Sequence, residues 1–307
     1  MEVTRGGNNP MAGAMRHHHP VMPFIAACAG IAVFSLMDAL MKNASIAVGA
    51  YSAMLVRSVM GAAMLWPIWK LSGAAFPARA VLKLHALRGT ISAGMATTFF
   101  WGLVRMPMAE GIALSFIAPL IALYLAAVLL KERVERGAVV ASLMGLGGVA
   151  VIAAAQLNVR AFSADAIWGI AAILLSAVLY AFNLVLQRKQ AQIASPMEVT
   201  FFQMVFSGLV LVIGAPWLLV LPGPGAAADI AMSAALAAVS LLLLTWAYAR
   251  AEAQALLSVE YTAFIWAAIL GWLMFDEAVT GATLAGTVLI VAGSWIAVHQ
   301  AIRPPPA

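Results

Sequence analysis

A series of long apolar runs separated by short polar segments limits what this chain can fold into. A run of about 20 apolar residues is the length that an α-helix needs to cross the hydrocarbon core of a bilayer. Only 9% of the 307 residues are charged, whereas a soluble domain carries roughly 25%. Each run is also too long and too uniform for the alternating strands of a barrel. The sequence therefore predicts an all-α integral membrane protein.

Ten apolar runs define ten predicted transmembrane helices. They cover about 23–41, 49–69, 86–105, 109–130, 137–155, 166–187, 198–221, 229–249, 253–275 and 281–300. The preceding residues, 1–22, are predicted to be a disordered tail, and residues 301–307 form a second tail. No small-residue cleavage signal follows the first run, so we expect it to be retained as a helix and not removed as a signal peptide.

The basic residues between the runs predict the orientation in the membrane. With the amino terminus in the cytoplasm, thirteen Lys and Arg residues fall in cytoplasmic segments, and only Lys42, Arg105 and Arg160 fall outside. Since cytoplasmic loops carry the excess of basic residues, both termini are predicted to be cytoplasmic. We expect a multi-pass protein of a bacterial inner membrane, in which the net charge of +5 does not indicate a nucleic-acid partner.

The chain also matches itself at an offset of 145 residues. The aligned pairs are Asp38 with Asn183, Arg105 with Arg250, Glu132 with Glu277 and Gly148 with Gly293. Each copy holds five predicted helices, an odd number, so the second copy must enter the membrane from the opposite side. The sequence thus predicts two inverted five-helix repeats, 23–155 and 166–300, around a central cavity, as is common among secondary transporters.

Two segments resemble the EamA type of the drug/metabolite transporter superfamily. They are "APLIALYLAAVLLKERVERGAVVASLMGLGGVAVI" at 118–152 and its partial echo "FIWAAILGWLMFDEAVTGATLAGTVLIVAGSWI" at 264–296. The resemblance covers nearly the whole chain and implies a cavity lined mainly by the first, third, fourth, sixth, eighth and ninth helices. The second copy departs from the family pattern at Glu260-Tyr261, where a proline is often found, and this leaves the substrate open.

An aspartate inside the first apolar run is the first candidate for a functional residue. A charge at the centre of a transmembrane helix costs roughly 2.5–3.5 kcal/mol, so Asp38 is expected to face a cavity or a partner. Ser35, Asp38 and Lys42 have the spacing of one helix face. We interpret Asp38 either as a substrate contact that carries a proton or as half of an ion pair with Lys42.

The aligned position in the second copy, Asn183, lies on a similar polar face between Tyr180 and Gln187. The two faces occupy equivalent positions of inverted halves, and we expect them to meet at the axis between the halves. The interpretations are a pair of substrate contacts or an interhelical hydrogen bond that serves packing.

Further candidates for the cavity are Glu260, Tyr261 and Arg57. Glu260 is deep in its run and is either a second proton carrier or a packed, protonated side chain. Arg57 is expected to bind a substrate carboxylate or to neutralise an acid such as Asp38 or Glu260, because a guanidinium binds carboxylates through two parallel hydrogen bonds.

Two tryptophans and two rows of small residues complete the candidates. Trp101 and Trp246 occupy equivalent positions in the two copies and are expected either to wall the cavity or to pack against lipid. The small residues are Gly137, Ala141 and Gly145 in one row and Ala282 and Gly286 in the other. Such rows predict close packing of helices, within the fold or in a homodimer.

The function that these patterns favour is secondary active transport of small amphipathic metabolites that are amino-acid-like, vitamin-like or cationic. The sequence has no GxxxxGK[ST] loop, so the energy must come from proton coupling or exchange, by alternating access. Export is favoured over import of a specific metabolite. The histidines, including His17, His18 and His19 in the tail, predict neither a metal site nor a cofactor. A membrane enzyme or a non-transporting receptor is the alternative class.

Overall fold

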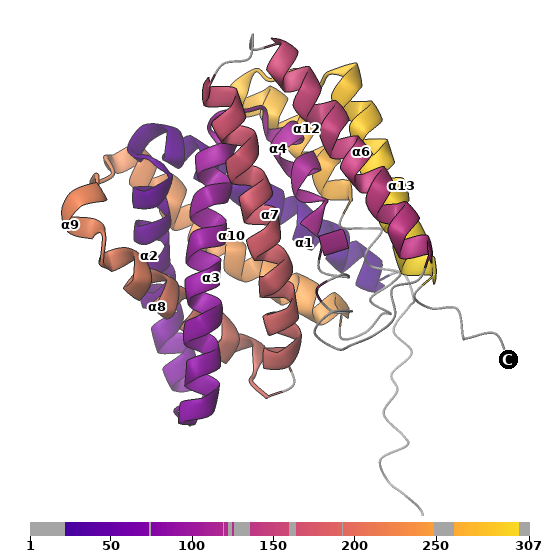
Figure 1. Cartoon of the computed structure of the whole chain (residues 1–307). Helices are drawn as coiled ribbons and strands as arrows, with labels where there is room; N and C mark the ends of the chain where they lie inside the picture. The colour runs from indigo at the N-terminus through magenta and orange to yellow at the C-terminus, as the bar shows by residue number, and fades with distance from the viewer. Residues whose placement is uncertain are drawn as a thin grey trace, which may run out of the picture.

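The computed structural model describes residues 22–73, 75–118, 120–121, 125, 136–159, 164–191, 193–248 and 261–300. This part of the chain is helical and holds no strand (Figure 1). The helices are α1 (Met22–Val48), α2 (Ala50–Leu71), α3 (Arg79–Leu103), α4 (Met108–Ser115), α6 (Arg136–Val159), α7 (Ala164–Ala191), α8 (Pro196–Val212), α9 (Ala215–Leu218), α10 (Pro224–Tyr248), α12 (Thr262–Phe275) and α13 (Gly281–Gln300). Among them α1, α2, α7 and α10 are long and apolar enough to cross a membrane.

Every predicted apolar run overlaps a helix, but some ends differ from the prediction. Helix α1 continues past residue 41 to Val48, so Lys42 lies within the helix and not in a loop. The chain turns at Gly49, whose φ of 81° is in the left-handed region that favours glycine. The predicted helices at 109–130 and 253–275 lie partly outside the described residues, which include α4 and α12.

The prediction of one helix over 198–221 is wrong in its second half. Helix α8 ends at Val212, and the chain bends before the short α9. Pro216 has no backbone N–H for a continuing helix. A Cβ atom on Gly214 would lie 2.8 Å from the hydroxyl oxygen of Tyr51, so glycine permits this close approach to α2.

Contacts between distant segments define two ends of the molecule in the described part of the chain. At one end, Arg105 after α3 binds Asp165 of α7 at 2.8 Å, and Asn43 of α1 donates to Asp229 of α10 at 2.7 Å. At the other end, the starts of α3 and α8 meet. We call the first the outer end and the second the inner end, after the predicted orientation.

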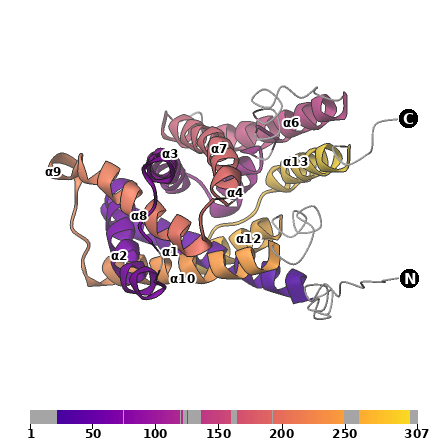
Figure 2. The same cartoon turned by 90° about the horizontal axis from the view of Figure 1, so that it is seen from below.

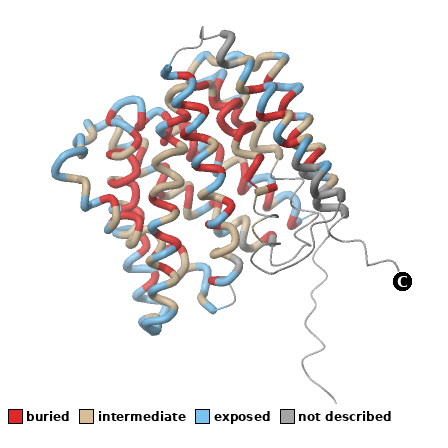
Figure 3. Tube along the Cα trace, in the orientation of Figure 1, coloured by how far each residue is buried: buried red, intermediate tan, exposed pale blue. Residues whose placement is uncertain are grey.

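Burial in this fold is the reverse of burial in a soluble protein. Asp38, Arg57 and Arg88 are buried, whereas large apolar side chains such as Trp168 and Leu242 are exposed. Figure 3 shows exposed positions along the outward faces of the helices and buried positions between them. This distribution is expected where hydrocarbon surrounds the protein, because polar groups then find partners only inside it.

Helices α6 and α13 lie side by side, as both views show (Figures 1 and 2). Two glycines contribute to this contact: the backbone of Gly148 on α6 lies against Gly286 on α13, which belongs to one predicted row. A Cβ atom at Gly286 would lie 2.7 Å from the carbonyl oxygen of Gly148. Gly145, from the row predicted on α6, lies instead against the side chains of Leu120 and Ile117. Gly286 and Gly145 thus serve packing within the chain, and a homodimer stays a prediction.

Replacing Gly286 with valine is expected to force α6 and α13 apart. Overpacking of this kind costs about 1–3 kcal/mol, and thermal unfolding of the purified protein in detergent measures the loss. Gly147→Val is the control, because a Cβ atom at Gly147 has nothing within 4 Å. Equal unfolding temperatures for the two variants would contradict the close contact.

Candidate functional site

The polar stripe predicted on the first helix is buried in the structure. Ser35, Asp38, Lys42 and Ser45 are each at most 4% exposed and share one face of α1. Lys42 forms an ion pair with Glu277 and not with Asp38. The interpretation of Asp38 as half of an ion pair with Lys42 is therefore wrong, and Asp38 has a different charged neighbour.

That neighbour is Arg57 on α2. The Asp38 carboxylate interacts electrostatically with the Arg57 guanidinium. In the described part of the chain, Arg57 is its charged partner. The two groups do not form a direct ion pair, which would require a nitrogen–oxygen distance of 4.0 Å or less. Arg57 is 9% exposed; one of its terminal nitrogens lies 3.8 Å from the Met54 sulfur, and its Nε has no hydrogen-bond partner. Two opposite charges thus interact in the interior without forming a direct ion pair.

A second buried guanidinium, that of Arg88 on α3, is held by three side-chain amides of α7. It donates from Nε to Asn183 Oδ1 at 2.7 Å and from its two terminal nitrogens to Gln190 Oε1 at 2.8 Å and Gln187 Oε1 at 3.3 Å. Ser92, one turn further along α3, lies 3.5 Å from the same Asn183 oxygen. These contacts join α3 and α7 through neutral partners.

The Arg88 cluster continues to the inner end of the molecule. Gln190 Nε2 lies 2.9 Å from His85 Nδ1, and His85 Nε2 lies 3.1 Å from Glu198 Oε1. An amide nitrogen can only donate, so Nδ1 of His85 accepts and Nε2 carries the proton that is donated to Glu198. A chain of hydrogen bonds therefore runs from Glu198 at the start of α8 to Asn183 in the middle of α7.

The two polar stripes that were expected to meet have separate partners in the structure. Asp38 faces Arg57 within the first half, and Asn183 binds Arg88 and Ser92 across the two halves. Tyr180 is half-buried and interacts electrostatically with Arg88. The structure thus gathers Asn183, Tyr180 and Gln187 at Arg88 and gathers Asp38 at Arg57.

At the outer end, an ion pair between the buried Lys42 and the partly exposed Glu277 is joined to the segment between α3 and α4. We call Lys42, Glu277, Met106 and Met108 the outer latch. Lys42 of α1 binds the Glu277 carboxylate and donates to the Met106 carbonyl at 2.9 Å. The other Glu277 oxygen accepts the Met108 N–H at 2.7 Å. The latch links Glu277, in the second half of the sequence, to three residues of the first half.

The predicted aromatic residues occupy less central places. Trp101 is 37% exposed, and the Arg105 guanidinium lies 3.4 Å from its ring centroid at the outer end. Trp246 packs in the cluster formed by Ala27 and Ile31 of α1. Tyr261 meets Phe116 edge to face at 5.3 Å, and Glu260 lies outside the described residues.

The residue that the sequence analysis missed is Arg88. It is one of the thirteen basic residues that the predicted orientation places in cytoplasmic segments, although it is 5% exposed within α3. The signal was present, because His85, Arg88 and Ser92 repeat the spacing of Ser35, Asp38 and Lys42 and so share one helix face.

Comparison with known proteins identifies the family. The model of the EamA-like transporter family matches residues 22–154 and again 167–298, two segments that begin 145 residues apart. The chain belongs to the EamA-like transporter family. It is therefore a membrane-embedded, multi-pass member of a family of small-molecule transporters, and this family indicates a transporter and not an enzyme.

Curated relatives of this EamA-like transporter include the pseudopaline exporter CntI of Pseudomonas aeruginosa, from strains UCBPP-PA14 and PAO1. Each is 28% identical over 260 residues, which are 84% of this chain and 89% of the relative. A crystal structure of another protein superimposes with a TM-score of 0.62 at 21% identity and covers 93% of this chain and 98% of its own. That likeness supports the fold of the EamA-like transporter.

Replacing Arg88 with leucine is expected to destabilise this EamA-like transporter, because the amide oxygens of Asn183, Gln187 and Gln190 each lose a charged donor. A buried unsatisfied polar group costs about 1–3 kcal/mol, so the unfolding temperature in detergent should fall clearly. Lys189→Leu removes a basic side chain that is exposed at the end of α7 and serves as the control. If both variants unfold at the wild-type temperature, the Arg88 cluster does not hold α3 to α7.

Proposed function

We propose that this protein is a secondary active exporter of a small amino-acid-like metabolite. The observation that carries the proposal is the buried, separated pair of Asp38 and Arg57. A buried charge in a membrane protein is costly, and such residues mark substrate and ion pathways. A pair kept only for stability would gain more from direct contact than from a gap.

The lack of a direct ion pair between Asp38 and Arg57 favours a substrate that carries both charges. An ammonium group is complementary to the Asp38 carboxylate, and a carboxylate is complementary to the planar donors of Arg57. An amino-acid-like zwitterion satisfies both groups at once, whereas a purely cationic compound satisfies only one. Among the substrate classes expected from the sequence, the amino-acid-like class fits best.

The direction of transport is proposed from the relatives. Both are exporters of pseudopaline, and the match extends over most of each chain. We therefore propose export from the cytoplasm across the inner membrane, with both termini cytoplasmic, as the distribution of basic residues favours. Pseudopaline is the first compound to test.

We propose alternating access as the mechanism. Two family matches 145 residues apart favour two inverted five-helix halves, which rock about a site between them. The outer latch joins these halves and closes the outer end. Protonation of Asp38 would release Arg57 to the substrate carboxylate, so a proton entering from outside would exchange for substrate leaving the cell.

Asp38→Asn is expected to abolish transport driven by a pH gradient. In everted membrane vesicles that are acidic inside, pseudopaline uptake should fall by about tenfold or more, since the carboxylate supplies binding and proton exchange, and tenfold corresponds to about 1.4 kcal/mol. Asp165→Asn removes a carboxylate that is exposed at the outer end and should keep wild-type uptake. Proton coupling through Asp38 is refuted if the Asp38→Asn vesicles still respond to the gradient. A wild type that transports neither pseudopaline nor amino acids refutes the substrate class.

Removing the outer latch is expected to open the outer end. In a Cys28→Ser, Ser35→Cys background, Lys42→Met with Glu277→Gln should raise the rate at which a membrane-impermeant thiol reagent labels position 35 from outside. We expect a rise of about tenfold, as for a shift of about 1.4 kcal/mol between two states.

The matched control is Arg105→Gln with Asp165→Asn. This pair also joins the two halves at the outer end, but its side chains are 24% and 62% exposed and contribute little energy. Its loss should leave the labelling rate unchanged. Equal rates in the two double variants would show that the latch does not close this end.

A further inference from the structure

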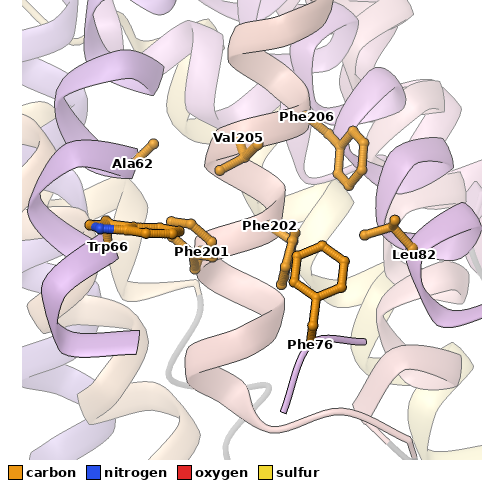
Figure 4. Close-up of a pocket in the computed structure, with 8 residues that line it drawn as sticks. All are labelled: Ala62, Trp66, Phe76, Leu82, Phe201, Phe202, Val205 and Phe206. Atoms are coloured by element: carbon orange, nitrogen blue, oxygen red, sulfur yellow. The ribbon is translucent and has the colours of Figure 1, made fainter. Parts of the chain in front are cut away.

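An apolar groove opens on the membrane-facing side of α2 and α8, near the inner end (Figure 4). It has a volume of about 390 Å³, and all its lining residues are apolar. Trp66 of α2, Phe76 before α3, and Phe202 and Phe206 of α8 form most of its wall. Apart from the indole N–H of Trp66, no side chain in this lining can form a hydrogen bond with a polar substrate, so the groove does not suit the transported metabolite.

Contacts between aromatic rings hold the walls of the groove in place. Phe201 stacks on Trp69 at 5.1 Å, and Phe202 stacks on the ring of His85 at 5.2 Å. Phe76 packs against Phe202 edge to face at 5.7 Å. Because these rings already have partners, the groove does not have to close on itself to bury them.

The rim of the groove at the inner end is basic. Lys70 ends α2, Arg79 begins α3, and Lys83 follows the groove residue Leu82; all three are exposed. The nearby acid, Glu198, is engaged by His85. Anionic lipid headgroups attract such basic side chains at a membrane surface.

We propose that the groove binds one acyl chain of an anionic phospholipid, with the headgroup phosphate held by Lys70, Arg79 and Lys83. The apolar wall matches the chain, and the positive rim matches the phosphate. A second copy of this protein is a poorer occupant, because a symmetric pairing through this face would bring two basic rims together. The proposal does not depend on which metabolite is transported.

Native mass spectrometry of the delipidated protein tests the proposal. Phosphatidylglycerol and phosphatidylcholine with identical acyl chains are added in separate titrations. We expect one phosphatidylglycerol to bind about tenfold more tightly than phosphatidylcholine. The combined variant Lys70→Gln, Arg79→Gln and Lys83→Gln should lose this preference, whereas Lys189→Gln, which removes an exposed charge on α7, should keep it.

Filling the groove with a larger side chain provides a second test of the proposal. Ala62 lines the groove, and its neighbour Ala63 is exposed outside it. Ala62→Trp should lower phosphatidylglycerol binding by about fivefold or more, and Ala63→Trp should not. Equal affinity for the two lipids, or equal binding by the two tryptophan variants, would overturn the proposal. A dimer that Ala62→Trp dissociates would also overturn it, by naming a second copy as the occupant.

Discussion

A charge inside a bilayer must be matched within the protein, and the interior of this transporter is organised by that requirement. The described part of the chain meets it in several ways. Lys42 and Glu277 form a direct ion pair, and Arg88 is surrounded by neutral amides. Glu110 accepts a hydrogen bond from Thr283, and Asp38 and Arg57 interact without a direct ion pair. Direct pairing and amide acceptors satisfy these charges and so stabilise one arrangement of helices. The separated pair leaves binding capacity unused. This difference, more than burial alone, distinguishes a place for a substrate from a place that serves the fold.

The two halves of the chain carry similar helices but different chemistry at the aligned positions. Asp38 is an acid with a cationic neighbour, whereas Asn183 is an amide that accepts a hydrogen bond from Arg88. The two aligned positions thus have different roles, since Asn183 belongs to the Arg88 cluster and Asp38 interacts with Arg57. In the proposed mechanism, the amide also removes one titrating group, which leaves Asp38 and Glu260, outside the described residues, as the proposed proton carriers.

How far the sequence predicted this structure depends on the range of the interactions. Apolar runs of about 20 residues located the helices, and helix spacing placed Ser35, Asp38 and Lys42 on one buried face, because both signals are local. The partner of Lys42 was not predictable in this way, since Glu277 is 235 residues away and is reached only through the packing of helices. Arg88 was missed for a related reason. A basic residue near a helix start looks like a loop residue until the three amides of α7 are placed around it.

The free energy of the ion pair in the outer latch is of the size that a gate requires. Removing one partner of a buried ion pair costs about 3–5 kcal/mol, because the other charge is left buried and unpaired. Opening the latch costs less, because water then reaches both Lys42 and Glu277. Moving a two-state equilibrium from 1:99 to 99:1 takes about 5.5 kcal/mol of differential binding. A closed state held by this pair is therefore favoured at rest and still within reach of the energy that a bound substrate and a proton supply. The exposed pair of Arg105 and Asp165 at the same end is too weak for that role, so the proposed gate is the pair of Lys42 and Glu277.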